Sequence, residues 1–339
     1  MTPVTESRLA DAFRDRLGGF IRDALDDPDV IEVMVNACGR VWLDRLRHGR
    51  RETGQQLPPA ATEAIIHLVA HHIGETVNEE RPLIAGTLPL TGERFQGVMP
   101  PIAKAPSFTI RKRPEVVFRL DDYVTDGAMT DAQAMILVNA LADRRNILVS
   151  GGTSSGKTTL LNALLAEPAI VDDRIALIED TVELQCAAHD QLQLLTRRAM
   201  RSTPAITIRD LVQTTLRLRP DRIVIGEIRD GAGALDMLKA WNTGHSGGLG
   251  TLHANSGSDA LHRLEDLISE VTANVPHRLI GQAADLIVHI VRTPEGRHVE
   301  EILAVHGHQD GRYITAEVAA LPAVAVPLTV VPTNKEFQK

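Results

Sequence analysis

One eight-residue stretch restricts the fold of this chain more than any other. Residues 151–158, GGTSSGKT, match the phosphate-binding loop pattern G-x-x-x-x-G-K-[ST]. Residues 146–150 before them have the composition of a short buried strand, and residues 159–166 after them favour a helix. A glycine loop between a strand and a helix turns backbone N–H groups inward, where the helix N-terminus adds positive potential. The sequence therefore predicts a cradle for nucleotide phosphates rather than an ordinary glycine turn.

The pattern assigns roles within this loop. Lys157 is expected to reach the β- and γ-phosphates, and the Thr158 hydroxyl is expected to bind Mg²⁺. The other contacts to the nucleotide are expected from Gly151, Gly152, Thr153, Ser154, Ser155, Gly156 and Thr159. The loop also contains the G-x-S-x-G pattern of a hydrolase nucleophile, with Ser154 at its centre. Lys157 and Thr158 directly after that pattern favour the phosphate interpretation.

Length and composition narrow the functional classes. A chain of 339 residues suggests two domains of ordinary size, and 43% hydrophobic residues allow a substantial core. The formal net charge of −8 argues against a protein that grips nucleic acid through a basic surface. Two cysteines, Cys38 and Cys186, are too few for a disulfide framework or a four-cysteine zinc site, and favour a reducing, cytoplasmic setting. Neither a signal peptide nor a membrane-spanning segment is expected.

The first part of the chain has the pattern of a small α+β domain, expected at residues 1–112. Helices are expected at 7–25 and 61–73, where apolar residues recur with helical spacing. Short strands separated by turn residues and prolines predict an antiparallel sheet; they are expected at 30–35 and 40–44, joined as a hairpin, and at 83–88, 94–98 and 107–111. Residues 113–128 are expected to form a linker.

Strands alternate with helices in the second domain, expected at residues 129–318, which predicts a parallel sheet covered on both faces. Its first helix is predicted to begin at Thr130, because Thr130 and Gln133 have capping-box spacing. The apolar face of this helix is predicted to contain Met135, Val138, Ala142 and their neighbours. The strands are expected at 147–150, 175–178, 223–225, 250–253, 286–291 and 299–305. Residues 319–339 are expected to be a flexible tail, because prolines interrupt their apolar run.

Two acidic segments follow predicted strands of this second domain. Residues 178–183, IEDTVE, lie where open α/β sheets bind ligands. The three carboxylates of Glu179, Asp180 and Glu183 could hold Mg²⁺ waters or orient an attacking water. A solvated acidic loop is the alternative. Another apolar strand ends in Glu227, and Gly226 stands where a metal-binding aspartate is usual. Glu227 is therefore predicted to be the base that activates water rather than a metal ligand.

Histidines form a further set of candidates. Residues 243–256 combine several glycines with His245 and His253, which could sense the γ-phosphate because an imidazole N–H can donate to it. A satisfied core histidine is the alternative for each. His67 and His71 have i,i+4 spacing on a predicted helix. They lack a His-Glu-x-x-His pattern, so a polar helix face is favoured over a metal site.

Basic residues gather near the end of the first domain. Phosphoryl transfer gains most from electrostatic stabilisation of charge on the γ-phosphate, and an arginine can supply it bidentately. Arg94 and Arg111 are the candidates for this role, with Lys112 and Arg113 next to the second of them. Ordinary solvated surface arginines are the alternative.

Together, these segments resemble the traffic ATPases of bacterial secretion, and most closely the conjugal-transfer ATPases of type IV secretion (TrbB-like). The resemblance extends from about residue 7 to about residue 305. The segments that carry it are ERFQG at 93–97, FTIRK at 108–112, the glycine loop at 151–158, IEDTVE at 178–183, LRPDRIVIGEIR at 218–229, KAWNTGH at 239–245 and TLHA at 251–254.

The resemblance implies a RecA-like P-loop NTPase domain, α/β in class, preceded by a smaller α+β domain with a PAS-like antiparallel sheet. It implies a homohexameric ATP hydrolase that uses ATP and Mg²⁺ and powers substrate transfer or pilus biogenesis. Such a ring is cytoplasmic, peripheral at the cytoplasmic face of the inner membrane, and contacts type IV secretion subunits there without binding nucleic acid directly.

The same resemblance implies roles for individual residues. Lys157 and Thr158 become phosphate and Mg²⁺ ligands, with Glu179 as a further metal ligand. The other catalytic assignments are Glu179 and Glu183 as acids of the Asp box, Glu227 as the catalytic glutamate, His253 as the coupling histidine, and Arg94 and Arg111 as arginines near the phosphates. Nucleotide between the two domains is expected to close a hinge, because the γ-phosphate gives extra contacts to the closed state.

Two departures from the family pattern concern the site. Ser154 and Ser155 occupy the middle of the glycine loop, where relatives often have a glycine, and a positive φ at Ser154 would imply strain. Gly250 replaces the Ala or Ser that often precedes the threonine of the His box. The four-cysteine zinc element of type II secretion and pilus-assembly ATPases is absent from the sequence, which disfavours that branch.

Three alternative functions remain open at this point. The chain could be a pilus-assembly or pilus-retraction motor. It could be a RecA-like nucleic-acid motor, which its acidic charge disfavours. It could also be a nucleotide-gated scaffold with little hydrolysis.

Overall fold

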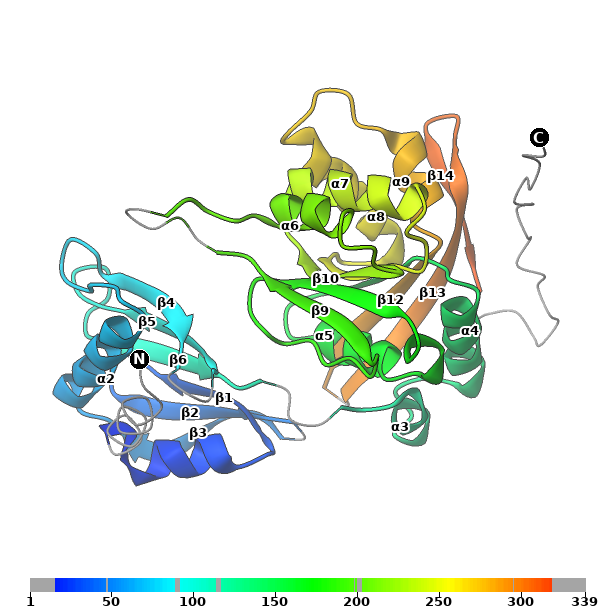
Figure 1. Ribbon diagram of the computed structural model, residues 1–339. Coiled ribbons are helices and arrows are strands. Elements are labelled where there is room, and N and C mark those ends of the chain that lie inside the picture. Colours follow the sequence, from blue (N-terminus) through cyan, green and yellow to red (C-terminus); the bar gives the residue numbers. More distant parts are fainter. Residues whose placement is uncertain are drawn as a thin grey trace, which may run out of the picture. The chain divides into compact units, whose positions relative to one another are not determined.

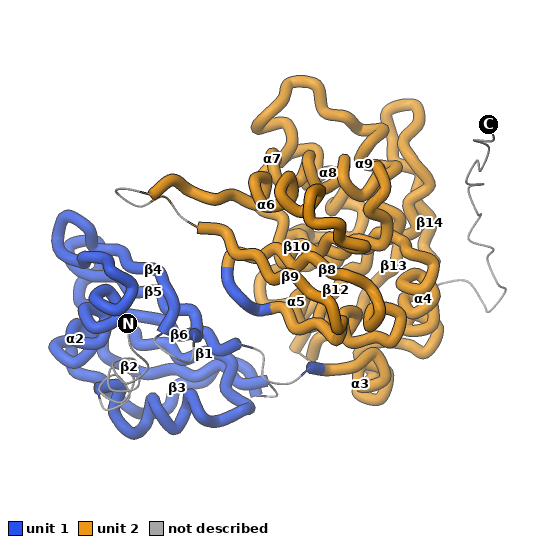
Figure 2. The backbone as a smooth tube through the Cα atoms, in the orientation of Figure 1, with its two compact units in different colours: residues 1–117, 181–183 blue, residues 118–180, 184–339 orange. Residues whose placement is uncertain are grey.

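The computed structural model describes residues 16–46, 48–88, 92–113, 117–197, 199, 203–294 and 296–318 (Figure 1). The chain divides into two compact units (Figure 2): residues 1–117 with 181–183, and residues 118–180 with 184–339. Of the helix predicted at 7–25, residues 16–26 are helical and residues 7–15 lie outside the described part. The tail predicted at 319–339 also lies outside it.

The first unit is built on a six-stranded sheet in the order β3-β2-β1-β6-β5-β4. All of these neighbours pair antiparallel, as predicted. The strands are β1 (Val30–Val35), β2 (Arg40–Arg45), β3 (Gly49–Gln56), β4 (Leu83–Thr87), β5 (Arg94–Val98) and β6 (Ser107–Arg111). Strand β3 was not predicted, because its sequence GRRETGQQ is polar throughout and its residues lie exposed or half-buried at the sheet edge.

One face of this sheet forms the core of the first unit. Helix α2 (Pro59–His72) buries Ile65, Ile66 and Val69 in the same cluster as the inward residues of β1, β5 and β6. Because side chains alternate along a strand, the residues between the buried ones point to the other face. Arg94 of β5 and Arg111 of β6 are direct register partners, so both lie on that second face.

The second unit contains an eight-stranded sheet in the order β14-β13-β12-β7-β11-β10-β8-β9. The strands from β12 to β9 in this order are parallel, as predicted, and β13 and β14 are antiparallel additions at one edge. Their bounds are β7 (Ile147–Gly151), β8 (Arg174–Glu179), β9 (Asp190–Leu195), β10 (Arg222–Ile228), β11 (Leu249–His253), β12 (Leu286–Thr293), β13 (Gly296–Gln309) and β14 (Arg312–Glu317).

Helices cover both faces of this sheet (Figure 1). One face packs against α3 (Leu120–Thr125), α4 (Asp131–Ala142), α5 (Lys157–Leu165) and the short 3-10 helix η1 (Pro168–Ile170). The other packs against α6 (Ile208–Thr215), α7 (Gly231–Asn242), α8 (Gly257–Ser269) and α9 (His277–Ala283). Along β7, Ile147 and Val149 belong to the first core and Leu148 to the second. This alternation explains why β7 is apolar at consecutive positions.

Helix α4 begins as predicted, but it buries a different face. Thr130 and Gln133 form the capping box, with the Thr130 Oγ1 atom accepting from the Gln133 amide at 3.2 Å. The three residues named for the apolar face are wrong, because Met135, Val138 and Ala142 are exposed. The buried face contains Ala134, Leu137, Ala140 and Leu141. Both sets have helical spacing, so periodicity alone could not choose the face that meets the sheet.

The segment expected as a linker is partly structured. Residues 120–125 form α3, whose Leu120 and Tyr123 are buried in the core of the second unit. Among the described residues, no helix is long and apolar enough to cross a lipid bilayer.

Candidate functional site

The glycine loop lies between β7 and α5, as the sequence predicts. Gly156 precedes α5 with a φ of +103°, and no side chain caps the first turn of the helix. The first amides of an uncapped helix point at whatever lies before it, together with the positive end of the helix dipole. The start of α5 therefore has the geometry of an anion site.

Two further positions in the loop, Gly151 and Ser154, are unusual. At Gly151, a Cβ atom would lie 2.3 Å from the carbonyl oxygen of Ile290, so only glycine fits beside β12. At Ser154, φ is +57°, in the left-handed region that disfavours residues with a side chain. The predicted strain at Ser154 is therefore present.

Lys157 is folded back onto its own loop. Its side chain is 7% exposed, and Nζ donates to the carbonyl oxygens of Gly151 at 3.0 Å and Gly152 at 2.7 Å. Nζ also lies 3.4 Å from Nδ1 of His253. The ammonium group is thus held at the mouth of the loop by acceptors that a phosphate oxygen can replace.

The strand order places His253 between the two other catalytic candidates. Strand β11 lies between β7 and β10, and its last residue, His253, pairs with Gly151. The His253 Nε2 atom lies 2.9 Å from Oε1 of Glu227 on β10. Lys157, His253 and Glu227 therefore form a continuous chain of polar contacts from the start of α5 to the ends of the neighbouring strands β11 and β10.

The protonation of His253 follows from its surroundings. Burial and the charge of Lys157 lower the pKa of His253, and Arg229 adds to this, while Glu227 acts in the opposite direction. A neutral ring with its proton on Nε2 satisfies both neighbours, because Nε2–H donates to Glu227 and Nδ1 accepts from Lys157.

Glu227 is held in its ionised form. Burial would raise the pKa of Glu227, but the hydrogen bond and charge of Arg229, with His253 and Lys157, leave it below its usual value. Arg229 contacts Oε2 of Glu227 through Nη2 and Oδ2 of Asp180 through Nη1, the latter at 3.2 Å. Arg229 thus joins the carboxylate of Glu227 to the acidic segment after β8.

Glu179 is a buried acid beside Gly226. Its side chain is 2% exposed, and its two oxygens accept from the Leu184 amide at 2.7 Å and from Nε2 of Gln193 at 3.1 Å. A Cβ atom at Gly226 would lie 3.3 Å from Cγ of Glu179. A side chain at position 226 would therefore pack tightly against Glu179. The role of Glu179 as a metal ligand stays a prediction.

Arg94, Arg111 and Glu183 belong to the first unit, which includes residues 181–183. Nη1 of Arg94 lies 3.0 Å from Oε1 of Glu183. Arg111 is the register partner of both Arg94 and Glu32. The structure therefore brings these two arginines together on one sheet face, and their approach to a nucleotide stays a prediction.

His245 is not a residue of this site. Strand β11 starts at Leu249, opposite Ile147, and ends at His253, opposite Gly151. His245 comes four residues before β11 and therefore lies toward the opposite end of the strand from the glycine loop. The prediction of His245 as a phosphate sensor is wrong, because spacing along the chain did not show on which end of the strand each histidine falls.

The glycines next to His245 have a packing role instead. A Cβ atom at Gly247 would lie 2.6 Å from Nη1 of Arg222, and one at Gly248 would lie 2.0 Å from Nε1 of Trp241. These two glycines permit close approach of large buried side chains.

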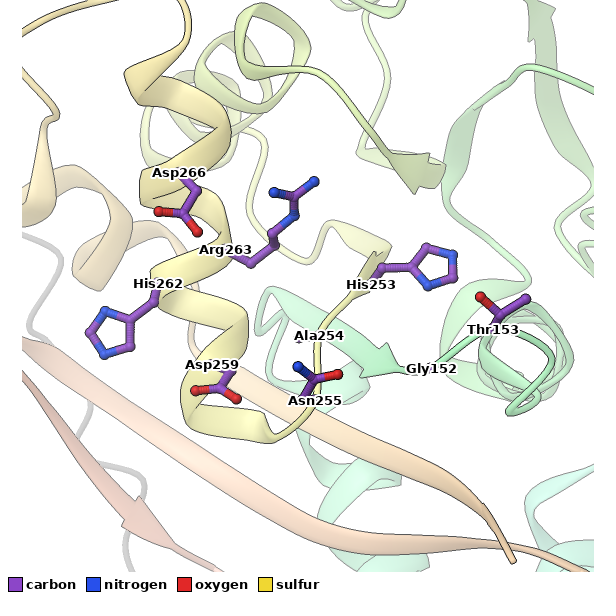
Figure 3. Close-up of a pocket in the computed structure, with 9 residues that line it drawn as sticks. All are labelled: Gly152, Thr153, His253, Ala254, Asn255, Asp259, His262, Arg263 and Asp266. Atoms are coloured by element: carbon purple, nitrogen blue, oxygen red, sulfur yellow. The ribbon is translucent and has the colours of Figure 1, made fainter.

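A pocket of about 460 Å³ opens beside the glycine loop. Figure 3 shows side chains of α8 on one side of it, and His253 and Thr153 on the other. It is lined by Gly152, Thr153, His253, Ala254, Asn255, Asp259, His262, Arg263 and Asp266. Apart from Gly152, Thr153 and His253, these lining residues were not predicted from the sequence. The signal for three of them was the spacing of Asp259, Arg263 and Asp266, which puts them on one helix face.

In comparisons with known proteins, this chain is similar to secretion and conjugal-transfer proteins. A family model described as "Type II/IV secretion system protein" matches residues 92–320. The "Conjugal transfer protein TrbB" of Rhizobium radiobacter is 46% identical over 316 residues, which cover 93% of this chain and 95% of that protein.

Two solved structures have a similar fold. The ATPase DotB of Legionella pneumophila superposes with a TM-score of 0.58 at 18% identity, covering 90% of this chain and 81% of that one. The pilus retraction motor PilT with bound ADP gives a TM-score of 0.53 at 18% identity, covering 88% of this chain and 80% of that one. These likenesses confirm the predicted fold class.

Proposed function

The chain belongs to the type II/IV secretion system protein family, and we propose that it is an ATP hydrolase that powers conjugal transfer through a type IV secretion system. The observation that carries the hydrolase assignment is the chain of contacts from Lys157 through His253 to Glu227. It connects a phosphate-binding lysine to an ionised carboxylate that can accept a proton from water. The relative at 46% identity, named for conjugal transfer, supports the biological role.

Nucleotide binding would use the start of α5. The uncapped first turn would favour a triphosphate, because free backbone amides and the positive end of the helix dipole attract an anion at a helix N-terminus. Lys157 would leave the carbonyls of Gly151 and Gly152 for the β- and γ-phosphate oxygens. The half-buried Thr158 at the start of α5 would hold Mg²⁺, which neutralises phosphate charge when bound.

Water activation would fall to Glu227. Its lowered pKa keeps the carboxylate ionised near neutral pH, so it can accept the proton of an attacking water. His253 would hold that carboxylate in place through the 2.9 Å contact and would sense the charge at Lys157. The pocket beside Gly152 and Thr153 leaves room for the terminal phosphate and the water, with Arg263 on its far wall.

The assembly would be a homohexameric ring at the cytoplasmic face of the inner membrane, in contact with other secretion subunits. Arg94 and Arg111 would add positive charge near the phosphates. Closure of the domains on ATP, and release after hydrolysis, would convert the chemistry into movement. This part of the proposal rests on family membership.

Substitution of Lys157 tests the nucleotide site directly. We expect Lys157→Ala to lose ATP binding and phosphate release, because Nζ is the charged group at the mouth of the loop. A matched control is Arg312→Ala, which removes an exposed cation from β14. The measurement is phosphate release by purified protein with Mg–ATP. Full turnover by Lys157→Ala would refute the assignment of this loop as the ATP site.

A further inference from the structure

The hairpin of β12 and β13 supports the glycine loop from one side. Strand β12 runs parallel to β7, and His289 pairs with Ser150, the residue before the loop. Their side chains are hydrogen-bonded, with 2.9 Å between Ser150 Oγ and His289 Nδ1. The next carbonyl, that of Ile290, faces Gly151 so closely that a Cβ atom there would lie 2.3 Å from it. The base of the loop is therefore fixed against β12.

Arg297, near the start of β13, reaches the middle of the same loop. Its Nε donates to the carbonyl oxygen of Ser154 at 3.3 Å. Its Cδ atom would lie 3.0 Å from a Cβ atom at Gly156. The arginine side chain thus lies along the loop between Ser154 and the first turn of α5. The guanidinium group therefore contacts the backbone of a residue whose own backbone conformation is unfavourable.

Ser154 is that residue. Its φ of +57° costs free energy for any residue with a side chain, whereas glycine adopts such a φ at little cost. A strained conformation persists only where its surroundings stabilise it. The hydrogen bond from Arg297 stabilises the left-handed conformation of Ser154, because the direction of the Ser154 carbonyl depends on the local backbone conformation.

We propose that Arg297 is a positioning residue for the phosphate loop. It holds Ser154 in the left-handed conformation, so the loop is shaped for phosphate before a nucleotide arrives. A loop that is already shaped loses less conformational entropy on binding. A glycine at position 154 would adopt the left-handed conformation at little cost. At Ser154, the long-range contact from Arg297 stabilises that conformation instead. This inference rests on the proposed ATP-binding function of the loop.

The proposal predicts an interaction between two substitutions. Arg297→Ala is expected to raise the Kd for Mg–ATP about tenfold, which corresponds to about 1.4 kcal/mol. In a Ser154→Gly background, the same substitution is expected to raise it less than about threefold, since glycine needs no help to adopt φ +57°. The turnover number at saturating ATP should change less than KM in Arg297→Ala, because Glu227 and His253 are untouched.

The experiment compares wild type, both single variants and the double variant by titration with a fluorescent ATP analogue and by steady-state hydrolysis. Arg312→Ala, an exposed arginine on β14, is the matched control and should match wild type. Thermal unfolding of each variant shows whether the fold is retained. The Arg297→Lys variant keeps the charge but not the Nε donor and should lie between wild type and Arg297→Ala.

The outcomes distinguish failure of the proposal for Arg297 from failure of the proposed ATP-binding function. Equal loss of affinity on Arg297→Ala in the wild-type and Ser154→Gly backgrounds would overturn the proposal, because Arg297 would then act on the nucleotide or on the fold at large. Unchanged affinity in Arg297→Ala would overturn it as well. Failure of the wild-type protein, rather than of the variants, to bind ATP would refute the proposed function itself.

Discussion

Arg222 offers the sharpest test of how the site is held in place. It starts β10, the strand that ends near Glu227, and its side chain is 2% exposed. Nε contacts Oδ2 of Asp173 at 2.5 Å. Nη1 donates to the Gly247 carbonyl at 3.2 Å, and Nη2 to the Leu141 carbonyl at 2.9 Å. Arg222→Met keeps most of the apolar stem and removes all three contacts.

The loss of unfolding free energy follows from what happens to the three groups that Arg222 contacts. Breaking a buried ion pair by removing one partner costs about 3–5 kcal/mol. Asp173 still has Arg144, and the Leu141 carbonyl still accepts from the Arg144 amide at 3.2 Å. The Gly247 carbonyl loses the bond from Arg222. We therefore expect the lower end of that range, about 3 kcal/mol of unfolding free energy.

The two tryptophans allow the measurement to be confined to one unit. Trp42 lies in the first unit and Trp241 in the second, so a Trp42→Phe background leaves Trp241 as reporter. Trp241 is buried and donates to the Ile223 carbonyl at 3.2 Å. Urea unfolding followed by its fluorescence gives the free energy change of the second unit.

A matched substitution at an exposed arginine separates burial from charge. Arg209→Met removes an ion pair with Asp236, but its side chain is 55% exposed, so we expect a change within about 1 kcal/mol. A loss below about 1 kcal/mol for Arg222→Met would refute the claim that Arg222 is a buried structural tie.

Two further predictions concern the acids of the site. Without Arg229, burial would dominate and the pKa of Glu227 would rise, so Arg229→Gln should shift the acid limb of the kcat/KM profile to higher pH; an acid limb that coincides with wild type would contradict the role of Arg229. Gly226→Asp would place a second carboxylate beside the buried Glu179, because the new Cβ atom would lie 3.3 Å from Cγ of Glu179. We therefore expect a lower Tm and weaker hydrolysis at every Mg²⁺ concentration. A lower Mg²⁺ requirement in that variant would show that position 226 tolerates a metal ligand.

Much of the fold could be predicted because its signals are local. The apolar runs before the loop and before Glu227 identified β7 and β10, and the capping box identified the start of α4. Strands β9 and β14 were not predicted. Both are edge strands, and most of their residues are exposed, so the hydrophobic pattern that marks a strand is weak there.

The candidate site was only partly predictable, because its arrangement depends on strand order. Lys157, His253 and Glu227 were found from motifs, whereas the order β7-β11-β10 that joins them is a property of the assembled sheet. The same limit explains the error at His245, which lies toward the other end of β11. Arg297 gave no signal, because its contact with Ser154 spans 143 positions of sequence.

Glu227→Gln tests the central claim most directly. The amide keeps the size of the side chain and removes the charge proposed to accept a proton, while Lys157, the proposed phosphate ligand, is unchanged. We expect phosphate release in a single turnover to fall by about 10²–10⁴-fold, with ATP affinity within about threefold of wild type. Glu317→Gln, on exposed β14, should leave both quantities unchanged. Phosphate release by Glu227→Gln within about tenfold of wild type would contradict the assignment of Glu227 as the base.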